Sequence, residues 1–342
     1  MSTRAHLLVW LSLLLLPAGC QKHEYFTDGD YFFLRHKGAD MPIWVRGNQA
    51  SRVFVLYLHG GPGNGSIIDA ASAAHRALQQ RYALVYWDQR ASGLSEGNSD
   101  PSTLTVPQFV EDLDRVVDLL NTRYHNPTIF LLGHSWGGAL GTAYLLDPGR
   151  QQRVRGWIGM DTGHNWARAN VLGAQFVTDY AAQAIARGEQ VDFWQKAAPW
   201  YAAHPITEEN LPVHTYLLGK AHGYFHNPDF DPLKTLDFNE LVFFSPLSVA
   251  GLFNFVYTEG QLKFTDLNFT PDLPRITLPT LLLWGRHDGI FPVPLAQEAY
   301  DALGTPPAQK SLVYFEDSAH SPFLEEPDKL VAAVTGFVER YR

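Results

Sequence analysis

A serine lies at the centre of a short glycine-rich segment, Gly133-His134-Ser135-Trp136-Gly137. An apolar run precedes this segment, and small residues with helical spacing follow it. A strand, a tight turn and a helix in this order place the serine hydroxyl at the apex of the turn, beside the helix N-terminus. Backbone N–H groups there stabilise the negative charge that develops in a reaction. The segment therefore predicts Ser135 as a nucleophile.

Two further residues supply the groups that such a serine needs. A neutral hydroxyl is a poor nucleophile and requires a base within hydrogen-bond reach. His320 follows a predicted strand and is the candidate base, because an imidazole accepts and returns a proton near neutral pH. Asp288 also follows a predicted strand, and we expect it to orient His320 and stabilise the imidazolium. Asp161, at the end of the strand after the serine, is the second candidate for this acid.

A second glycine-rich loop, at 59–65, follows the buried apolar run at 53–58. A loop that is rich in glycine leaves its backbone N–H groups accessible to a ligand. We expect the amide of Gly61 and the amide of Trp136, directly after the serine, to form an oxyanion hole. Asp88 and Arg90 follow the next predicted strand, and this pair is expected to organise a loop by ion pairing and hydrogen bonds.

The elements that must position these residues alternate between strand and helix. Predicted strands lie within 31–45 and at 53–58, 83–87, 128–132, 154–160, 280–284 and 311–315. Predicted helices lie at 68–81, 105–124, 293–303 and 327–342, and Thr105 is the expected N-cap of the second. This alternation predicts an α/β fold with a mostly parallel, doubly wound sheet, in which chemistry gathers at the carboxyl ends of the strands.

One long segment interrupts the alternation. From 166 to 271 the sequence carries helical patterns and many aromatic residues, which predicts a mainly helical cap inserted into the α/β core. The core is then expected to consist of 31–165 and 272–342, after a tether at 21–30. Each aromatic residue of the cap is expected to pack in its interior, and together they indicate a pocket roof that favours apolar groups.

The first twenty residues have a different composition from the rest of the chain. Arg4 precedes an apolar run of ten residues, Leu7 to Leu16, which is too short to span a bilayer comfortably and is typical of an export signal. Cys20, the only cysteine of the chain, stands where a lipoprotein signal would be cleaved and modified. We therefore predict an exported, membrane-anchored lipoprotein of a bacterial cell envelope, with Cys20 as the lipid attachment site.

Composition excludes several other classes of protein. The chain has 342 residues, 46% of them hydrophobic and 18% charged, which is enough apolar material for a large core. The formal net charge of −9 argues against a nucleic-acid-binding surface. The sequence contains neither a cysteine–histidine cluster of the zinc type nor a P-loop or dinucleotide fingerprint, and we expect neither a metal nor a cofactor.

Three motifs together resemble the proline iminopeptidase family, peptidase family S33, of the α/β-hydrolase superfamily. They are HGGPG at 59–63, WDQRASGLS at 87–95 and GHSWGG at 133–138. The resemblance implies an enzyme that releases N-terminal proline from peptides, with Ser135, Asp288 and His320 as the catalytic triad and Gly61 and Trp136 as the oxyanion amides. It also implies carboxylates in the cap that bind the free amine of the substrate, for which the candidates are Glu208, Glu209, Glu240 and Glu259.

The sequence also leaves two other functions open. An esterase or amidase for apolar acyl groups would use the same three residues and need no free amine. A surface lipoprotein that only binds a ligand would have no use for the serine, aspartate and histidine together. We expect a small peptide or ester as the substrate, contact with a membrane through the anchor alone, and infer no protein partner.

Overall fold

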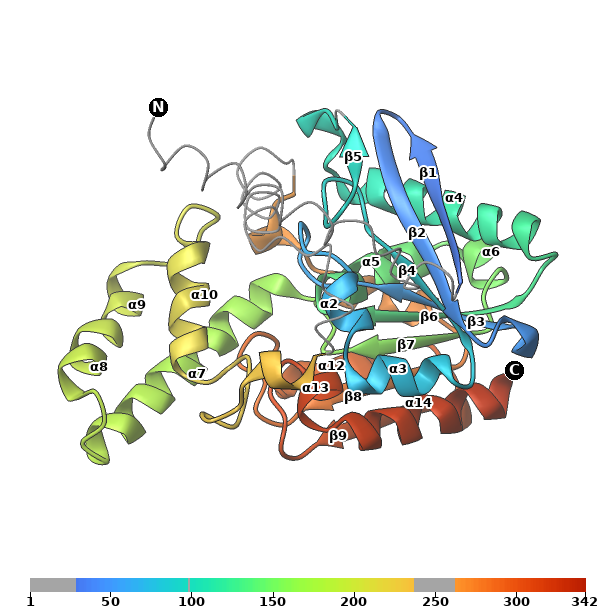
Figure 1. The fold of residues 1–342 in the computed structure, drawn as a ribbon. Helices are drawn as coiled ribbons and strands as arrows, with labels where there is room; N and C mark the ends of the chain where they lie inside the picture. The colour runs from blue at the N-terminus through green and yellow to red at the C-terminus, as the bar shows by residue number, and fades with distance from the viewer. Residues whose placement is uncertain (1–28, 98, 237–261) are drawn as a thin grey trace, which may run out of the picture.

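The computed structural model describes residues 29–97, 99–236 and 262–342 and has a large sheet at its centre (Figure 1). The strand order is β1-β2-β4-β3-β6-β7-β8-β9, and β5 pairs with β2. The strands are β1 (Asp30–His36), β2 (Ala39–Gly47), β3 (Val53–Leu58), β4 (Ala83–Trp87), β5 (Glu96–Gly97), β6 (Thr128–His134), β7 (Gly156–Met160), β8 (Thr280–Gly285) and β9 (Lys310–Phe315). Strands β4, β3 and β6 to β9 run parallel, whereas β1, β2 and β5 pair antiparallel. The predicted fold class is confirmed.

The burial of each strand follows from its position in the sheet. Every residue of β3, β4, β7 and β8 is buried, because helices cover both faces of a parallel sheet. The edge strand β1 alternates between exposed and half-buried residues, as expected for an antiparallel strand with one face in solvent. The apolar runs of the sequence therefore mark the strands at the centre of the sheet.

Helices pack on both faces of the sheet. They are α2 (Ile67–Ala70), α3 (Ala73–Gln79), α4 (Val106–Arg123), α5 (Trp136–Leu145), α6 (Pro148–Gln151), α12 (Pro294–Ala302), α13 (Pro322–Glu325) and α14 (Pro327–Tyr341). The apolar side chains of α4, α5 and α12 belong to one core cluster, and those of α3 and α14 belong to another. Thr105 caps α4 as predicted, since its hydroxyl accepts from the N–H of Gln108 at 3.3 Å.

The helix expected at 68–81 is two helices in the structure. α2 ends at Ala70, and α3 begins at Ala73 after a break at Ser72. The hydroxyl of Ser72 accepts from the N–H of His75, so this serine caps α3 and marks the start of a new helix. The prediction of a single helix here was wrong.

Between β7 and β8 the chain forms a separate helical layer, which projects from one end of the sheet (Figure 1). It contains α7 (Trp166–Ala186), α8 (Val191–Ala197), α9 (Trp200–Ala203) and α10 (Leu211–Lys220), and short 3-10 helices at Pro232–Thr235, Phe264–Asp266 and Thr270–Arg275 follow. Its own apolar cluster includes Val177, Trp194 and Leu217. We call this layer the cap. Its predicted boundaries, 166 and 271, stay a prediction, because residues 237–261 lie outside the described residues.

The predicted N-terminal features also lie outside the described residues. These are the signal segment at 1–20 with Cys20, and most of the tether at 21–30. In the part of the chain that the structure describes, no helix combines the length and the apolar character needed to cross a membrane.

Candidate active site

Ser135 lies in a strained turn between a strand and a helix. It follows β6 directly and precedes the first residue of α5, and its backbone φ of 57° is rare for a residue with a side chain. Backbone hydrogen bonds hold this conformation. The Ser135 N–H donates to the carbonyl of Met160, and the Ser135 carbonyl accepts from the N–H groups of Gly138 and Gly163. The turn lifts the side chain out of the sheet, as expected for a nucleophile elbow.

The two glycines that flank Ser135 are required by close packing. A Cβ on Gly137 would lie 1.9 Å from the carbonyl oxygen of Leu58, and a Cβ on Gly133 would lie 2.5 Å from that of Gly137. Both distances are far shorter than any real contact of a Cβ atom. The G-x-S-x-G spacing is therefore a steric requirement for bringing α5 this close to β3 and β6.

His320 and Asp288 meet at the carboxyl ends of β9 and β8. Nδ1 of His320 lies 2.9 Å from Oδ2 of Asp288 and donates to it in the tautomer that carries the proton on Nδ1. The other carboxylate oxygen of Asp288 accepts from the backbone N–H groups of Ile290 and Phe291, at 2.7 and 3.0 Å. Burial lowers the pKa of the His320 ring to about 3, so the imidazole is neutral at physiological pH and able to accept a proton.

Asp161 lies beside this pair but does not take the place of Asp288. It follows β7 with a φ of 45°, and its Oδ1 accepts from the N–H of Gly285 at 2.9 Å. In the described part of the chain its buried Oδ2 has no N–H or O–H partner, and the carboxyl of Asp288 is within hydrogen-bonding reach. Burial raises the pKa of both carboxyls well above the ordinary value, but the hydrogen bond between them raises the pKa of Asp161 further and lowers that of Asp288. We therefore expect Asp161 to hold a proton and Asp288 the negative charge.

The two residues predicted to form the oxyanion hole are Gly61 and Trp136. Gly61, with a φ of 122°, belongs to the loop after β3 and lines the same cavity as Ser135. Trp136 is the first residue of α5, where a backbone N–H has no partner inside the helix. Their role in stabilising an oxyanion stays a prediction.

The loop after β4 supports both segments. Trp136 donates its ring N–H to Oε1 of Gln89 at 2.9 Å, and the Gln89 amide donates to the carbonyl of His59 at 3.1 Å. Asp88 accepts from Ser66 and from the N–H of Leu94, which ties the loop after β3 to the loop after β4. Arg90 forms a fully buried ion pair at 2.9 Å with Asp112 of α4. Asp88 and Arg90 thus organise the loops as expected, but the ion pair of Arg90 is with Asp112 rather than with Asp88.

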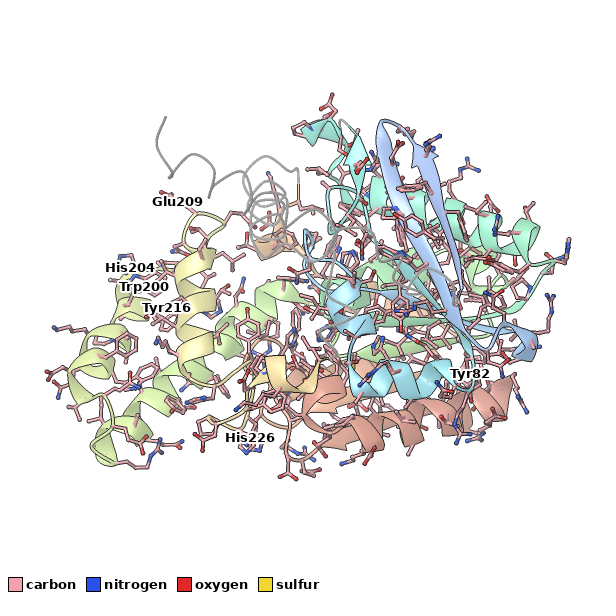
Figure 2. All side chains as sticks on the ribbon, in the orientation of Figure 1. Tyr82, Trp200, His204, Glu209, Tyr216 and His226 are labelled. Carbon is pink, nitrogen blue, oxygen red and sulfur yellow. The ribbon has the colours of Figure 1, made fainter. Side chains whose placement is uncertain are left out.

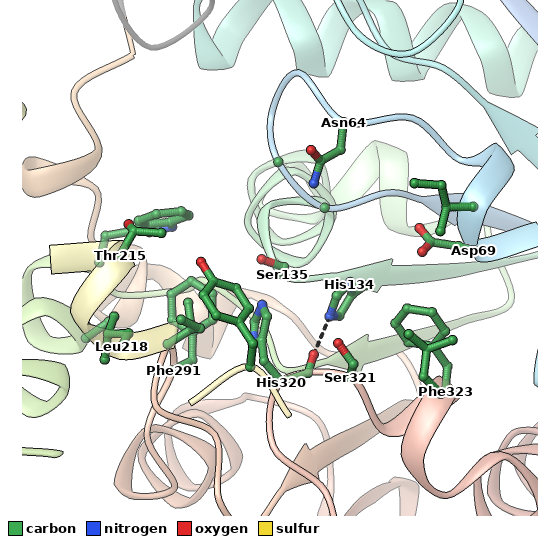
Figure 3. Close-up of a pocket in the computed structure, with 18 of the residues that line it drawn as sticks. Asn64, Asp69, His134, Ser135, Thr215, Leu218, Phe291, His320, Ser321 and Phe323 are labelled. Carbon is green, nitrogen blue, oxygen red and sulfur yellow. Dashed lines mark hydrogen bonds between the residues drawn. The ribbon is translucent and has the colours of Figure 1, made fainter. Parts of the chain in front are cut away.

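A cavity of about 300 Å³ lies between the sheet and the cap and contains the side chains of Ser135 and His320 (Figure 3). Apolar side chains form most of its wall and come from α2, α7, α10, α13 and the segments after α10 and β8: Ile68, Trp166, Ala169, Leu211, Leu218, Tyr224, Ile290, Phe291, Phe323 and Leu324. Other aromatic residues of the cap, such as Trp194 and Phe193, pack in the interior of the cap. The expected apolar roof therefore exists, and only a few of the cap aromatics contribute to it.

The cap glutamates implied by the resemblance do not line this cavity where the structure describes them. Glu208 accepts from the N–H and the hydroxyl of Thr265, at 2.7 and 2.9 Å, and so joins two parts of the cap. Glu209 is exposed on the outer side of the cap (Figure 2). Glu240 and Glu259 lie outside the described residues. The carboxyl that does line the cavity is Asp69 on α2, which the sequence interpretation missed.

Comparison with known proteins agrees with this geometry. The family model described as "alpha/beta hydrolase fold" matches residues 53–327, so the chain belongs to the α/β-hydrolase family and is a hydrolase. It resembles proline iminopeptidases, so the resemblance indicated by the three sequence motifs is confirmed. A probable aminopeptidase, YbaC, of Bacillus subtilis is 24% identical over 83% of this chain and 88% of its own length.

Two proline iminopeptidases are also similar to this chain, one in sequence and one in structure. A proline iminopeptidase of Heyndrickxia coagulans is 25% identical over 83% of this chain and 90% of its own length. The crystal structure of a proline iminopeptidase of Mycobacterium smegmatis superposes with a TM-score of 0.62 at 18% identity, over 91% of this chain and 98% of that one. At this identity the superposition supports the fold alone.

Proposed function

We propose that this hydrolase is an aminopeptidase of the proline iminopeptidase type, with a Ser135–His320–Asp288 catalytic triad. The observation that carries the proposal is the His320–Asp288 hydrogen bond at the cavity that also contains Ser135. The aminopeptidases among the relatives supply the choice of substrate. An esterase or amidase for apolar acyl groups would use the same residues and is the alternative.

The reaction would follow from the chemistry of these groups. The Ser135 hydroxyl attacks the scissile carbonyl as His320 takes its proton, and the oxyanion receives hydrogen bonds from the amides of Gly61 and Trp136. Return of the proton from His320 to the leaving amine breaks the peptide bond and leaves an acyl group on Ser135. A water molecule, deprotonated by His320, then releases the acyl group as a carboxylic acid and restores the hydroxyl. Asp288 stabilises the imidazolium both when Ser135 is acylated and when water releases the acyl group.

A small panel of substrates distinguishes the two functions. The protein from Gln21 onward receives prolyl-anilide, N-acetyl-prolyl-anilide and a short-chain nitrophenyl ester. We expect prolyl-anilide to be cleaved with a kcat/KM at least tenfold above that of its acetylated form. Ester hydrolysis without cleavage of prolyl-anilide would instead establish the esterase.

We also propose that residues 1–20 direct export and that Cys20 carries a lipid. The support is the sequence: a basic start, ten apolar residues and a lone cysteine after small residues. The full chain, expressed in a bacterial host with an alkyne fatty acid, is expected to incorporate the label and to fractionate with membranes, whereas a Cys20→Ser chain does neither. Equal labelling of both chains would refute the attachment site.

A further inference from the structure

Asp69 is an acidic side chain on the wall of the active-site cavity. It lies on α2, is half-buried, and is the only acidic residue among the described residues that line this cavity. Figure 3 shows its carboxyl directed into the cavity, with Asp69 and Phe323 on one side of Ser135 and Thr215 and Leu218 on the other. The mechanism proposed above does not use it.

No cation accompanies this carboxyl in the part of the chain that the structure describes. The Tyr57 hydroxyl donates to Oδ2 of Asp69 at 2.8 Å, and the charge that acts on this carboxyl, that of Asp88, is negative. No lysine or arginine in the described ranges forms a salt bridge with the Asp69 carboxyl.

The histidines of the cavity do not supply a charge either. Burial lowers the pKa of His134 and His320 to about 3 and that of His214 to about 4, so all three rings are neutral near pH 7. Burial and the negative charge of Asp88 raise the pKa of Asp69 to about 7. An ionised carboxyl in an apolar wall is costly without a partner of opposite charge, and a cationic ligand would remove this cost.

We propose that Asp69 binds a protonated amine of the substrate, while the rest of the substrate extends past Ser135 toward α10. This inference rests on the proposed function and gives it a substrate class: small, largely apolar molecules with a positively charged amine. Phe323, Leu324 and Ile68 line the same cavity and would contact the apolar part next to the amine. The residue that binds the amine thereby belongs to the α/β core, whereas the family resemblance implied carboxylates of the cap in this role.

The binding test uses a pair of ligands that differ in charge and are not cleaved. In the Ser135→Ala protein, calorimetry measures the Kd of benzylamine and of benzyl alcohol at pH 6 and pH 8. At pH 8 we expect the amine to bind at least tenfold more tightly than the alcohol. At pH 6 the preference shrinks severalfold, because Asp69 is then mostly protonated whereas the amine stays charged.

Asp69→Asn in the same background is expected to remove the preference at both pH values. The amide keeps the shape and can still accept from the Tyr57 hydroxyl, and a thermal melt checks that the variant is folded. Glu209→Gln, which removes an exposed cap carboxylate, is the matched control and keeps the preference.

Two results would overturn the inference and leave the proposed peptidase intact. One is an equal Kd for the amine and the alcohol before any change at Asp69. The other is a preference that survives Asp69→Asn but disappears in Glu240→Gln or Glu259→Gln. Failure of the proposed function has a different outcome, namely absence of Ser135-dependent cleavage of prolyl-anilide, and an Asp69-dependent preference for the amine would still stand beside it.

Discussion

Replacing Ser135 with alanine is expected to lower kcat on the best substrate of the panel by about 10⁴-fold or more, with little change in KM. The substitution removes the only atom that forms the covalent bond to the acyl group, while the cavity wall and the oxyanion amides remain. Because the strain at φ 57° belongs to the backbone, loss of the hydroxyl does not relax the turn. Steady-state kinetics of both proteins measure the expected loss of kcat, and a thermal melt of both checks that the fold is unchanged.

Labelling with a fluorophosphonate locates the nucleophile independently of any substrate. The probe phosphonylates an activated serine, and mass spectrometry of the digested protein is expected to find the adduct on the peptide that contains Ser135. The peptide with Ser321, a second serine on the cavity wall, serves as an internal control. An adduct on Ser321, or unchanged activity in Ser135→Ala, would remove Ser135 as the nucleophile.

The central sheet could be predicted from the sequence because local composition determines it. A strand between two helical layers needs apolar side chains on both faces, and this requirement leaves runs such as 53–58 and 280–284 that are recognisable without a structure. The turn at Ser135 could be predicted for a similar reason. Only glycine fits at 133 and 137, so the steric requirement is visible as a residue pattern.

Asp69 could not be predicted because its environment depends on long-range contacts. In the sequence it is one carboxylate within the short apolar segment Ile67-Ile68-Asp69-Ala70, which is compatible with an exposed helix position. Its direction into the cavity follows from the break at Ser72, which separates α2 from α3, and from the hydrogen bond to Tyr57 of β3. A cap at Ser72 was visible in principle, since serine is a preferred N-cap residue, but the apolar spacing around it favoured one continuous helix.

The sequence could only partly decide whether Asp161 or Asp288 is the acid that pairs with His320. Asp161 and Asp288 both follow strands of the sheet, and β7 and β8 are neighbours, so the sequence order alone leaves both near the histidine. The structure distinguishes them by hydrogen bonds. Asp288 accepts from His320 and from two backbone N–H groups, which stabilise a negative charge, whereas Asp161 accepts from one N–H.

This distinction predicts unequal effects of two isosteric substitutions. Asp288→Asn is expected to lower kcat by about 10³- to 10⁴-fold, because an amide neither fixes the Nδ1–H tautomer of His320 nor stabilises the imidazolium. Asp161→Asn is expected to change kcat only severalfold, since the side-chain amide that it introduces can donate to Asp288 as the protonated carboxyl does. Single-turnover kinetics with the best substrate of the panel measure both.

Because the two carboxyls share one site, comparing Asp161→Asn with Asp288→Asn shows which of them carries the negative charge. If Asp161→Asn were the more damaging change, the negative charge would belong to Asp161, and Asp288 would be the proton carrier that supports it. If each single variant kept a kcat within about tenfold of the parent and only the double variant lost it, either carboxylate would be able to serve His320. The hydrogen bonds of Asp288 argue against both results, since moving the charge to Asp161 would leave two backbone N–H groups and the His320 ring facing an uncharged acid.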